Sequence, residues 1–382
     1  MKRVFVLVTV LFLLFGVAPI RIVAAPPEVE AKGAVLMDAA TGTVLYEQNA
    51  HEKLAPASVT KVMTMLLIME AIDSGRIGWE DTVTASEAAA AKGGSQVYLK
   101  AGETMTVSDM VKSIAVSSAN DCACAMAEHL AGSEEAFVEK MNQRARELGM
   151  EDTHFVNCTG LDDGPDAAAH LTSANDIAIM SQELLHHHPD IKKYTTIWMD
   201  TIRNGTFGLS NTNKLVRFYH GATGLKTGFT SSAGYCLSAS AQREGMELIA
   251  VVLGSETSPK RFAACKSLLD YGFANYALVA PEYTPQAIPV ELGTEETVKA
   301  IPARVPKLLI DKSQRSTVTT RVEQKEKIAA PVSQGQRLGT LTVLSGEQVL
   351  EQIPLVAETT VPKLTFLQLW RWVLGRMAMG EM

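Results

Sequence analysis

The sequence predicts an α/β (α+β) protein in which helices surround one antiparallel sheet and a small all-β domain follows. Strand-like segments lie at both ends of the first 280 residues, and a long helical region lies between them. Short strands from both ends can pair, so a single antiparallel sheet with packed helices accounts for this pattern. Beyond Pro281 the chain changes to short alternating runs rich in Val, Thr, Pro and Gly, which indicate an all-β unit.

The first 25 residues have the layout of a secretory signal peptide. Lys2 and Arg3 precede an apolar run over residues 4–17, and small residues follow it. The run is shorter than the ~20 residues that span a bilayer, which favours cleavage over an uncleaved membrane anchor. We therefore expect an exported protein, whose formal charge falls from −7 to −10 when Lys2, Arg3 and Arg21 leave with the leader. Such an acidic chain does not suit a protein that coats nucleic acid.

A predicted β-hairpin and a series of helices follow the leader. Residues 32–48 alternate in polarity around a turn, as the two strands of a hairpin do. From about Ala57 to His188 apolar residues recur at helical spacing. Thr106 lies three residues before Asp109, the spacing of a capping box at a helix start. The expected helices cover residues 59–72, 107–116, 122–130 and 134–148.

Strand character returns after this helical region. The expected strands cover residues 221–230, 235–241 and 248–253, and a helix over 259–276 ends the block. The short strands of the β-rich part are expected at residues 300–305, 316–322, 338–343 and 349–356. We therefore divide the chain into a leader (1–25), a main domain (26–280), a β-rich domain (281–360) and a C-terminal helix (361–382).

The C-terminal segment predicts an amphipathic helix at a membrane surface. Arg371 and Arg376 interrupt a short apolar segment, which does not suit a membrane span. Tryptophan and arginine on an apolar helix suit the membrane interface, although a helix docked on its own protein is the alternative. We expect residues 363–379 to hold the exported protein on the outer face of the cytoplasmic membrane. The narrow polar stripe of this helix consists of Thr365, Gln368, Arg371 and Gly375.

Histidines and cysteines give no strong metal signal. There is no His-Glu-x-x-His motif, and the run 186–188 of three histidines precedes Pro189, as at a solvated helix end. Five cysteines in an exported chain leave at least one unpaired. The cysteines in apolar runs suit the role of small buried hydrophobic residues; these are Cys122, Cys124, Cys236 and Cys265.

Ser58 and Lys61 are the first candidates for chemistry. They lie three residues apart at the start of a long apolar helix, so they share one face of its first turn. A serine nucleophile needs a base, and a lysine can serve if burial or a cationic neighbour lowers its pKa. Taken alone, the pair favours a capping serine and a surface lysine, because this spacing often arises by chance.

Two further segments strengthen this interpretation. A loop between two expected helices can present Ser118 and Asn120 side by side. Lys226, Thr227 and Gly228 follow one another in a segment with strand character. Glycine in a strand allows another chain or a substrate to approach closely.

Together the three segments resemble the Ser-x-x-Lys, Ser-x-Asn and Lys-Thr-Gly motifs of penicillin-binding proteins and serine β-lactamases. The leader, the β-rich region and the tail extend the resemblance over essentially the whole chain, which is similar to the serine-type D-Ala-D-Ala carboxypeptidases. The resemblance implies a β-lactamase/transpeptidase-like antiparallel sheet with helices on both faces and a helical subdomain. Further segments similar to low-molecular-weight penicillin-binding proteins are 159–163, 170–176, 203–205, 211–215 and 258–262.

The resemblance also implies a reaction on peptidoglycan stem pentapeptides. Ser58 would attack the carbonyl between the last two D-alanines, and Lys61 would accept its proton. Ser118 would pass a proton toward the leaving D-alanine, while Asn120 would hold the substrate amide and Lys61. Lys226 would help to keep Lys61 neutral and would attract the substrate carboxylate.

The remaining implied roles concern the substrate carboxylate and the oxyanion. Thr227, next to Gly228, would bind the carboxylate with help from Arg261. The backbone N–H groups of Ser58 and Phe229 would stabilise the tetrahedral oxyanion. β-Lactams would acylate Ser58 and act as covalent inhibitors, and the resemblance implies no metal, no organic cofactor and no nucleic-acid partner.

Three alternatives remain open from the sequence. A class A β-lactamase needs a glutamate for deacylation, whereas the loop at residues 157–176 contains Asp162, Asp163 and Asp166 but no glutamate. A noncatalytic wall-binding protein could keep the same fold. Endopeptidase or transpeptidase activity in the same pocket is the third alternative.

Overall fold

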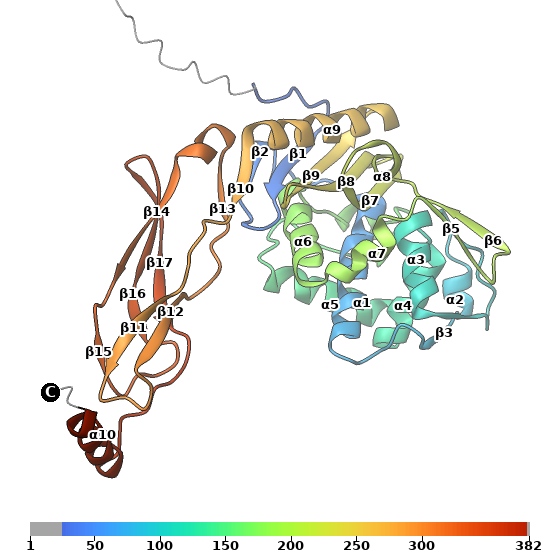
Figure 1. Ribbon diagram of the computed structural model, residues 1–382. Coiled ribbons are helices and arrows are strands. Elements are labelled where there is room, and N and C mark those ends of the chain that lie inside the picture. Colours follow the sequence, from blue (N-terminus) through green and yellow to red (C-terminus); the bar gives the residue numbers. More distant parts are fainter. Residues whose placement is uncertain (1–24, 380–382) are drawn as a thin grey trace, which may run out of the picture.

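A five-stranded antiparallel sheet forms the centre of the main domain (Figure 1). The structure, a computed structural model, describes residues 25–379, so nearly all of the predicted leader lies outside the described residues. The order β2-β1-β9-β8-β7 joins the N-terminal hairpin to strands some 200 residues later, which confirms the predicted single sheet. The strands are β1 (Gly33–Asp38), β2 (Val44–Gln48), β7 (Ala222–Thr230), β8 (Gly234–Arg243) and β9 (Met246–Ser255).

Side chains alternate between the two faces of this sheet, and helices cover both. Val35 packs into the core under the helical region, which includes α6 (Ala174–His187). Leu36, the next residue, packs on the opposite face into the core beneath α9 (Ser258–Asn275). This period of two, apolar on both faces, is the pattern of a sheet buried between layers.

The helical region encloses α1 (Lys61–Asp73) on all sides. Its side chains are apolar around the whole circumference, and α3, α4 and α6 pack against it. The first residues of α1 are therefore held in the interior. Thr106 accepts a hydrogen bond from the Asp109 N–H (3.1 Å), as the predicted cap requires. The other helices of the region are α2 (Glu87–Ala90), α3 (Val107–Ser117), α4 (Asn120–Ala131), α5 (Glu134–Glu147), α7 (Lys192–Thr195) and α8 (Leu215–Phe218).

Two short antiparallel strand pairs within this region were not predicted from the sequence. One pairs β3 with β4 and the other pairs β5 with β6, each without a long apolar run of its own. Short strands with few buried residues give little periodic signal. Their bounds are β3 (Thr82–Thr84), β4 (Thr104–Thr106), β5 (Met199–Ile202) and β6 (Phe207–Ser210).

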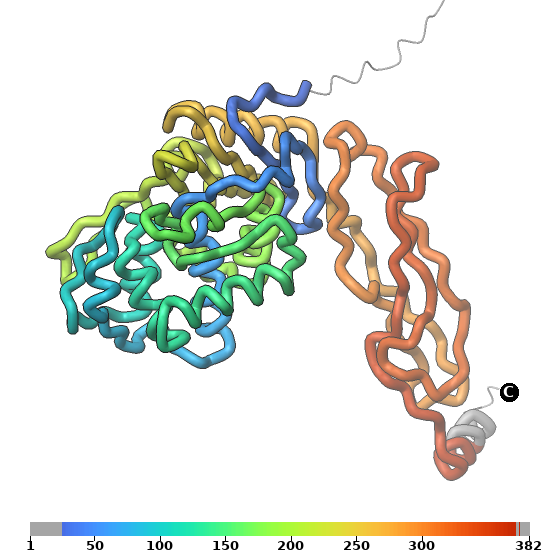
Figure 2. Tube along the Cα trace, turned by 180° about the vertical axis from the view of Figure 1, so that it is seen from behind, coloured from blue at the N-terminus to red at the C-terminus, as the bar shows by residue number. Residues whose placement is uncertain are grey.

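The C-terminal part is an elongated β domain beside the main domain (Figures 1 and 2). Its six-stranded sheet has the order β14-β16-β17-β12-β11-β15, and its core of Ile, Val, Leu and Ala is separate from the cores of the main domain. The strands are β11 (Gln286–Glu291), β12 (Thr297–Pro302), β14 (Val318–Gln324), β15 (Ile328–Ala329), β16 (Arg337–Ser345) and β17 (Gln348–Ala357).

One strand pair crosses the predicted boundary at residue 281. β10 (Tyr276–Val279) continues from α9 and pairs antiparallel with β13 (Leu308–Asp311), which follows β12 in the chain. Lys312 strengthens this junction by donating to the Phe273 carbonyl (3.1 Å). The two parts of the chain are therefore joined by backbone pairing as well as by a covalent connection.

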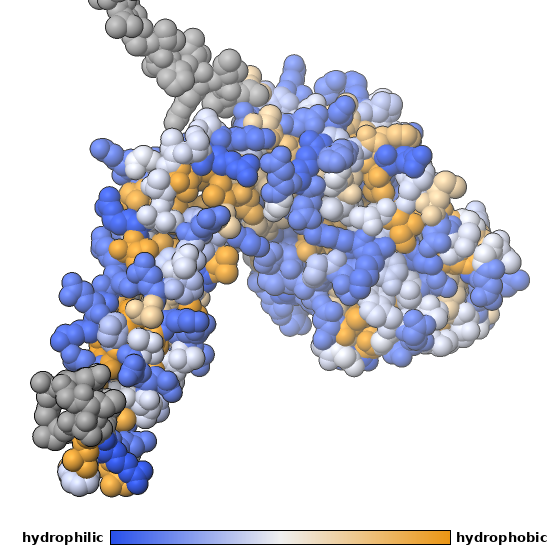
Figure 3. All heavy atoms as spheres, in the orientation of Figure 1, coloured by the Kyte–Doolittle hydropathy of each residue, from blue (hydrophilic) through white to orange (hydrophobic). Residues whose placement is uncertain are grey.

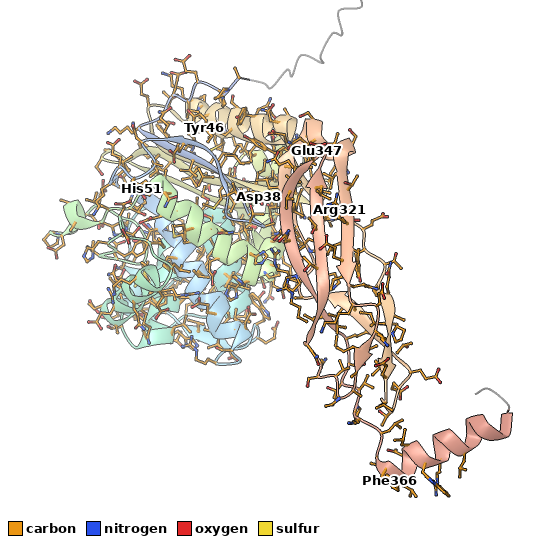
Figure 4. The ribbon with its side chains drawn as sticks, turned by 90° about the vertical axis from the view of Figure 1, so that its left-hand side faces the viewer. Asp38, Tyr46, His51, Arg321, Glu347 and Phe366 are labelled. Carbon is orange, nitrogen blue, oxygen red and sulfur yellow. The ribbon has the colours of Figure 1, made fainter. Side chains whose placement is uncertain are left out.

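The last element of the described residues is α10 (Phe366–Met379), at the tip of the β domain. Phe366 lies at the far end from the main domain, whereas Glu347 lies near it (Figure 4). Phe366 is 83% exposed, Leu367 and Trp370 are also exposed, and apolar atoms are visible at this tip (Figure 3). Within residues 25–379, no helix combines the length and hydropathy that a membrane crossing requires.

Candidate active site

Ser58 and Lys61 come together at the entrance to α1. Ser58 lies in a 3₁₀ turn (Ala57–Thr60), and Lys61 is the first residue of α1. In a 3₁₀ turn, residues three apart are eclipsed, so the two side chains project in the same direction. The Lys61 Nζ donates to the Ser58 Oγ over 2.9 Å. The predicted pair is therefore in direct contact, although the local helix type differs from the predicted α-helical turn.

Burial changes the acid–base behaviour of Lys61. The side chain is 0% exposed, and desolvation lowers its pKa to about 7, although Cys158 and Asp121 act in the opposite direction. Near neutral pH about half of the side chains are then uncharged. A neutral amine in contact with a hydroxyl is a base placed to accept its proton.

A turn at residues 157–161 holds the other side of Lys61. The Thr159 carbonyl accepts a hydrogen bond from Lys61 Nζ (2.7 Å). The Asn157 Oδ1 accepts from the N–H groups of Thr159 (3.1 Å) and Gly160 (2.6 Å), which fixes the turn. Gly160 has φ +80°, and a Cβ there would lie 1.9 Å from the Ala57 carbonyl oxygen. Only glycine allows this turn to pack against the residue that precedes Ser58.

His170 ties the same loop to the nucleophile turn. The Val156 N–H donates to its Nδ1 (3.1 Å), so Nδ1 carries no proton and Nε2–H can donate to the Thr60 Oγ1 (2.8 Å). Thr60 in turn donates to the Ala57 carbonyl (2.9 Å). Burial, aided by the nearby His154 and Lys61, lowers the pKa of His170 to about 4. The imidazole is therefore neutral over the range in which Lys61 titrates.

Ser118 and Asn120 lie at the turn between α3 and α4. Ser118 ends α3 with φ +64°, is buried, and turns the chain directly into α4. The Asn120 Nδ2 donates to the Gly93 carbonyl (2.7 Å). The buried Asn120 Oδ1 has no hydrogen-bond partner among the described residues, so the expected bond to Lys61 is not formed. That acceptor is available to an incoming N–H donor.

The strand β7 forms the opposite side of the site and is an edge strand of the sheet. A Cβ on Gly228 would lie 2.6 Å from the Pro56 carbonyl and 3.0 Å from the Ser58 backbone nitrogen, so this glycine allows β7 to touch the nucleophile turn. Thr227 Oγ1 donates to Thr212 Oγ1 (2.6 Å). The backbone N–H of Thr212 in turn donates to the Val116 carbonyl (3.1 Å). β7 is thereby linked to the end of α3, two residues before Ser118.

Lys226 is the second buried cation of the site. Its Nζ donates to the Thr227 carbonyl (2.8 Å). Burial, together with the positive charges of Lys61 and Arg261, holds the pKa of Lys226 well below its usual value. An anion bound beside Lys226 would stabilise its charged form, because an opposite charge compensates the desolvation.

Phe229 was predicted to contribute a backbone N–H group to the site, and Arg261 was predicted to help Thr227 bind the carboxylate. The Phe229 side chain is 52% exposed and lies against the Tyr235 ring at 4.4 Å between centroids. The buried Arg261 Nη1 donates to the carbonyls of Gly228 (2.8 Å) and Cys236 (3.2 Å). These bonds hold β7 against β8, so Arg261 is engaged with the backbone rather than directed freely toward a ligand.

The structure thus gathers the three predicted motifs around Ser58. It also reveals residues that sequence reasoning did not assign to the site, and each acts through the backbone or through another side chain. The Asn-Cys-Thr-Gly turn chemistry at 157–160 was the available signal for part of this set. The added residues are Gly93, Asn157, Thr159, Gly160, His170 and Thr212.

The cysteines do not take part in pairing. All five are free and buried. This is the expected role of Cys122, Cys124, Cys236 and Cys265, and the structure adds Cys158 to them. Cys122 and Cys124 follow Asn120 on α4, and Cys158 lies next to Thr159. Burial raises the pKa of the Cys122 thiol well above its ordinary value.

Two protein-family models together match most of the chain. The family model described as D-alanyl-D-alanine carboxypeptidase matches residues 21–257. The model described as the C-terminal domain of penicillin-binding protein 5 matches residues 273–363.

Individual relatives agree with these matches. The chain is 43% identical to the D-alanyl-D-alanine carboxypeptidase DacF of Bacillus subtilis over 353 residues, which cover 91% of this chain and 90% of DacF. It is 33% identical to DacC of Escherichia coli, with 91% and 88% of the two chains covered.

Solved structures show the same likeness. Penicillin-binding protein 5 of Haemophilus influenzae superposes with a TM-score of 0.73 at 31% identity, over 89% of this chain and 99% of that one. Penicillin-binding protein D2 of Listeria monocytogenes, in its ampicillin-bound form, gives a TM-score of 0.59 at 32% identity over 65% of this chain and 100% of the other.

Proposed function

Because this chain belongs to the D-alanyl-D-alanine carboxypeptidase family, a family of serine peptidases, we propose that Ser58 is its catalytic nucleophile. The protein is a serine-type D-Ala-D-Ala carboxypeptidase, a hydrolase. The observation that carries the assignment of Ser58 is its 2.9 Å contact with the buried Lys61 amine, whose pKa is about 7. Lys61 in its neutral form accepts the Ser58 proton as Oγ attacks.

Acylation exchanges one bond for another at the substrate carbonyl. The Ser58 Oγ forms an ester with the carbonyl carbon of the penultimate D-alanine, and the C–N bond to the terminal D-alanine breaks. Ser118 passes the proton to the departing nitrogen. Asn120 receives the substrate amide N–H at its unpartnered Oδ1. Water then hydrolyses the ester and releases the shortened stem peptide.

The terminal carboxylate of the substrate is held from β7. Lys226 supplies positive charge, and Thr227 donates its hydroxyl in place of its bond to Thr212. Gly228 keeps this strand close enough to Ser58 for one substrate to reach both. Arg261 contributes by holding the Gly228 carbonyl, and so positions the strand.

The oxyanion is stabilised by the backbone N–H groups of Ser58 and Phe229. Such a donor is typically worth about 3–4 kcal/mol of transition-state stabilisation. A β-lactam presents the same carbonyl next to a carboxylate and acylates Ser58 as a covalent inhibitor. The ampicillin- and cefotaxime-bound structures of the Listeria relative support this part of the proposal.

Release of D-alanine from a synthetic pentapeptide tests the proposed roles. The wild type should release one D-alanine per peptide, and Ser58→Ala should release none above background. Lys61→Ala should lose acylation while its unfolding transition stays cooperative. A Ser58→Ala variant that still released D-alanine at the wild-type rate would contradict the assignment.

We further propose export and peripheral anchoring on the outer face of the cytoplasmic membrane. The exposed aromatic and aliphatic side chains of α10 support residues 363–379 as the contact with the membrane surface. The separate hydrophobic cores support a division into a catalytic domain (26–280), a β domain (281–360) and a terminal helix (361–382) after the leader (1–25).

Vesicle sedimentation tests the anchor. The chain from residue 26 should sediment with vesicles that contain anionic lipid, and a variant ending at residue 362 should remain in the supernatant. Val305→Ser is a matched control, because Val305 is an exposed apolar residue (74%) of the β domain outside α10. Equal sedimentation of the full and shortened chains would contradict the anchoring role.

A further inference from the structure

An open groove lies between the segment 97–103 and the turn of the β5–β6 hairpin. This hairpin projects from the helical part of the molecule (Figure 1). None of the proposed reaction steps uses the side chains of the groove. It encloses about 590 Å³, and its main lining side chains are Tyr98, Lys100, Glu103, Arg203 and Phe207.

The charged side chains of Asp121 and Arg203 hold the backbone around Tyr98, whose ring is exposed at this groove. Its ring is 70% exposed, and its φ of +58° is a left-handed conformation that a bulky residue rarely adopts. The buried Asp121 carboxylate accepts from the N–H groups on both sides, Val97 (3.1 Å) and Leu99 (3.0 Å). Arg203 donates to the Val97 carbonyl (2.8 Å). Strain that is fixed by its surroundings in this way is typical of ligand sites.

The groove is amphipathic, and this restricts the chemistry of its ligand. Tyr98 and Phe207 meet edge to face at 6.4 Å, so they form an apolar corner. Lys100 is exposed beside it, and Glu103 pairs with Arg203 (2.6 Å). A wholly apolar ligand would desolvate these charged groups, while a simple anion would leave the rings unused. An acetylated amino sugar offers a C–H face to the rings and hydroxyl and amide groups to the polar side chains.

The distance to the catalytic residues suits the sugar that carries the stem peptide. The Asn120 N–H donates to the Ser95 carbonyl (2.7 Å). Tyr98 is three residues from Ser95, so at most about 11 Å of chain separate them. The four residues of the stem peptide on the sugar side of the attacked carbonyl span at most about 14 Å when they are extended. A stem peptide that is attacked at Ser58 can therefore extend its sugar toward the groove.

We propose that this groove binds the N-acetylated amino sugar to which the stem peptide is joined. The inference rests on the function proposed above and extends it from the terminal dipeptide to the glycan. Tyr98 is a binding residue, and Asp121 and Arg203 position it. The enzyme therefore prefers stem peptides that are attached to glycan over free peptides.

The test compares a free pentapeptide with the same pentapeptide on its disaccharide. Tyr98→Asn is the informative variant, because asparagine tolerates the left-handed backbone but lacks the ring. Phe218→Ala removes a similarly exposed aromatic ring (76%, against 70% for Tyr98) from α8, outside the groove, and is the matched control. The wild type should show a higher kcat/KM for the disaccharide substrate. Tyr98→Asn should lose about threefold to tenfold of kcat/KM on that substrate, chiefly in KM, and little on the free pentapeptide.

The outcomes separate this inference from the proposed function. Equal loss on both substrates, or no loss on the disaccharide substrate, overturns the groove as a sugar site. Unchanged labelling of Tyr98→Asn by a penicillin shows that the catalytic residues are intact in the variant. If the wild type releases no D-alanine from either substrate, the proposed function fails, whatever the behaviour of Tyr98.

Discussion

The acid–base state of Lys61 makes acylation pH-dependent in a calculable way. Its pKa is lowered to about 7 by burial, and only the neutral amine can accept the Ser58 proton. The neutral fraction is about 9% at pH 6 and about 91% at pH 8, from a pKa of 7. The rate of acylation should therefore rise about tenfold between these two pH values and then level off.

The assay is the initial rate of Ser58 labelling by a fluorescent penicillin at subsaturating concentration. Labelling measures acylation without a contribution from product release. Circular dichroism at each pH controls for loss of the fold. A rate that stayed constant from pH 6 to 8, or that rose only above pH 9 as for an ordinary lysine, would refute the role of a buried neutral base.

Two further predictions concern the loop that supports Ser58. Gly160→Ala should slow labelling by about 100-fold, because its Cβ would lie 1.9 Å from the Ala57 carbonyl oxygen and shift the nucleophile turn. Gly164→Ala in the same loop has open space around its Cβ and should label at the wild-type rate. Equal labelling rates for the two variants would contradict the role of Gly160 in packing. Burial lowers the pKa of His170 to about 4 in the native state. As the pH falls, His170 therefore takes up its proton in the unfolded chain before it does so in the native state. The free energy of unfolding should decrease by about 3 kcal/mol between pH 6.5 and 4. In urea titrations His170→Gln, which can keep both hydrogen bonds to Val156 and Thr60, should show a shallower pH slope, and an unchanged slope would show that other groups titrate.

The sheet and the main helices were predictable because their signals are local and periodic. The alternation at residues 32–48 and the helical spacing at 107–116 depend on which side chains face a core. One sheet built from strands of both ends was predicted from the need to bury them, and the structure shows that β1 pairs with β9 in it. The β3–β4 pair and the β5–β6 hairpin were missed, since strands of three or four residues carry no reliable periodicity.

The catalytic candidates were identified because their chemistry requires particular side chains at fixed spacing. Ser58 and Lys61 are an example, and the structure brings them into contact. The supporting groups were not identified, because they act through main-chain atoms that any sequence supplies. The Thr159 carbonyl on Lys61 is one case, and the close approach of Gly160 to Ala57 is another. For Arg261, the resemblance implied help in binding the substrate carboxylate, whereas its Nη1 donates to the backbone carbonyls of Gly228 and Cys236.

The most direct test of the account is the site of covalent attachment of a β-lactam. The chain from residue 26 should be incubated with a penicillin, digested, and analysed by mass spectrometry. One adduct is expected, on the peptide that contains Ser58, and it should be lost in Ser58→Ala with the unfolding transition unchanged. An adduct on another residue, or stoichiometric labelling that persists in Ser58→Ala, would contradict the central claim.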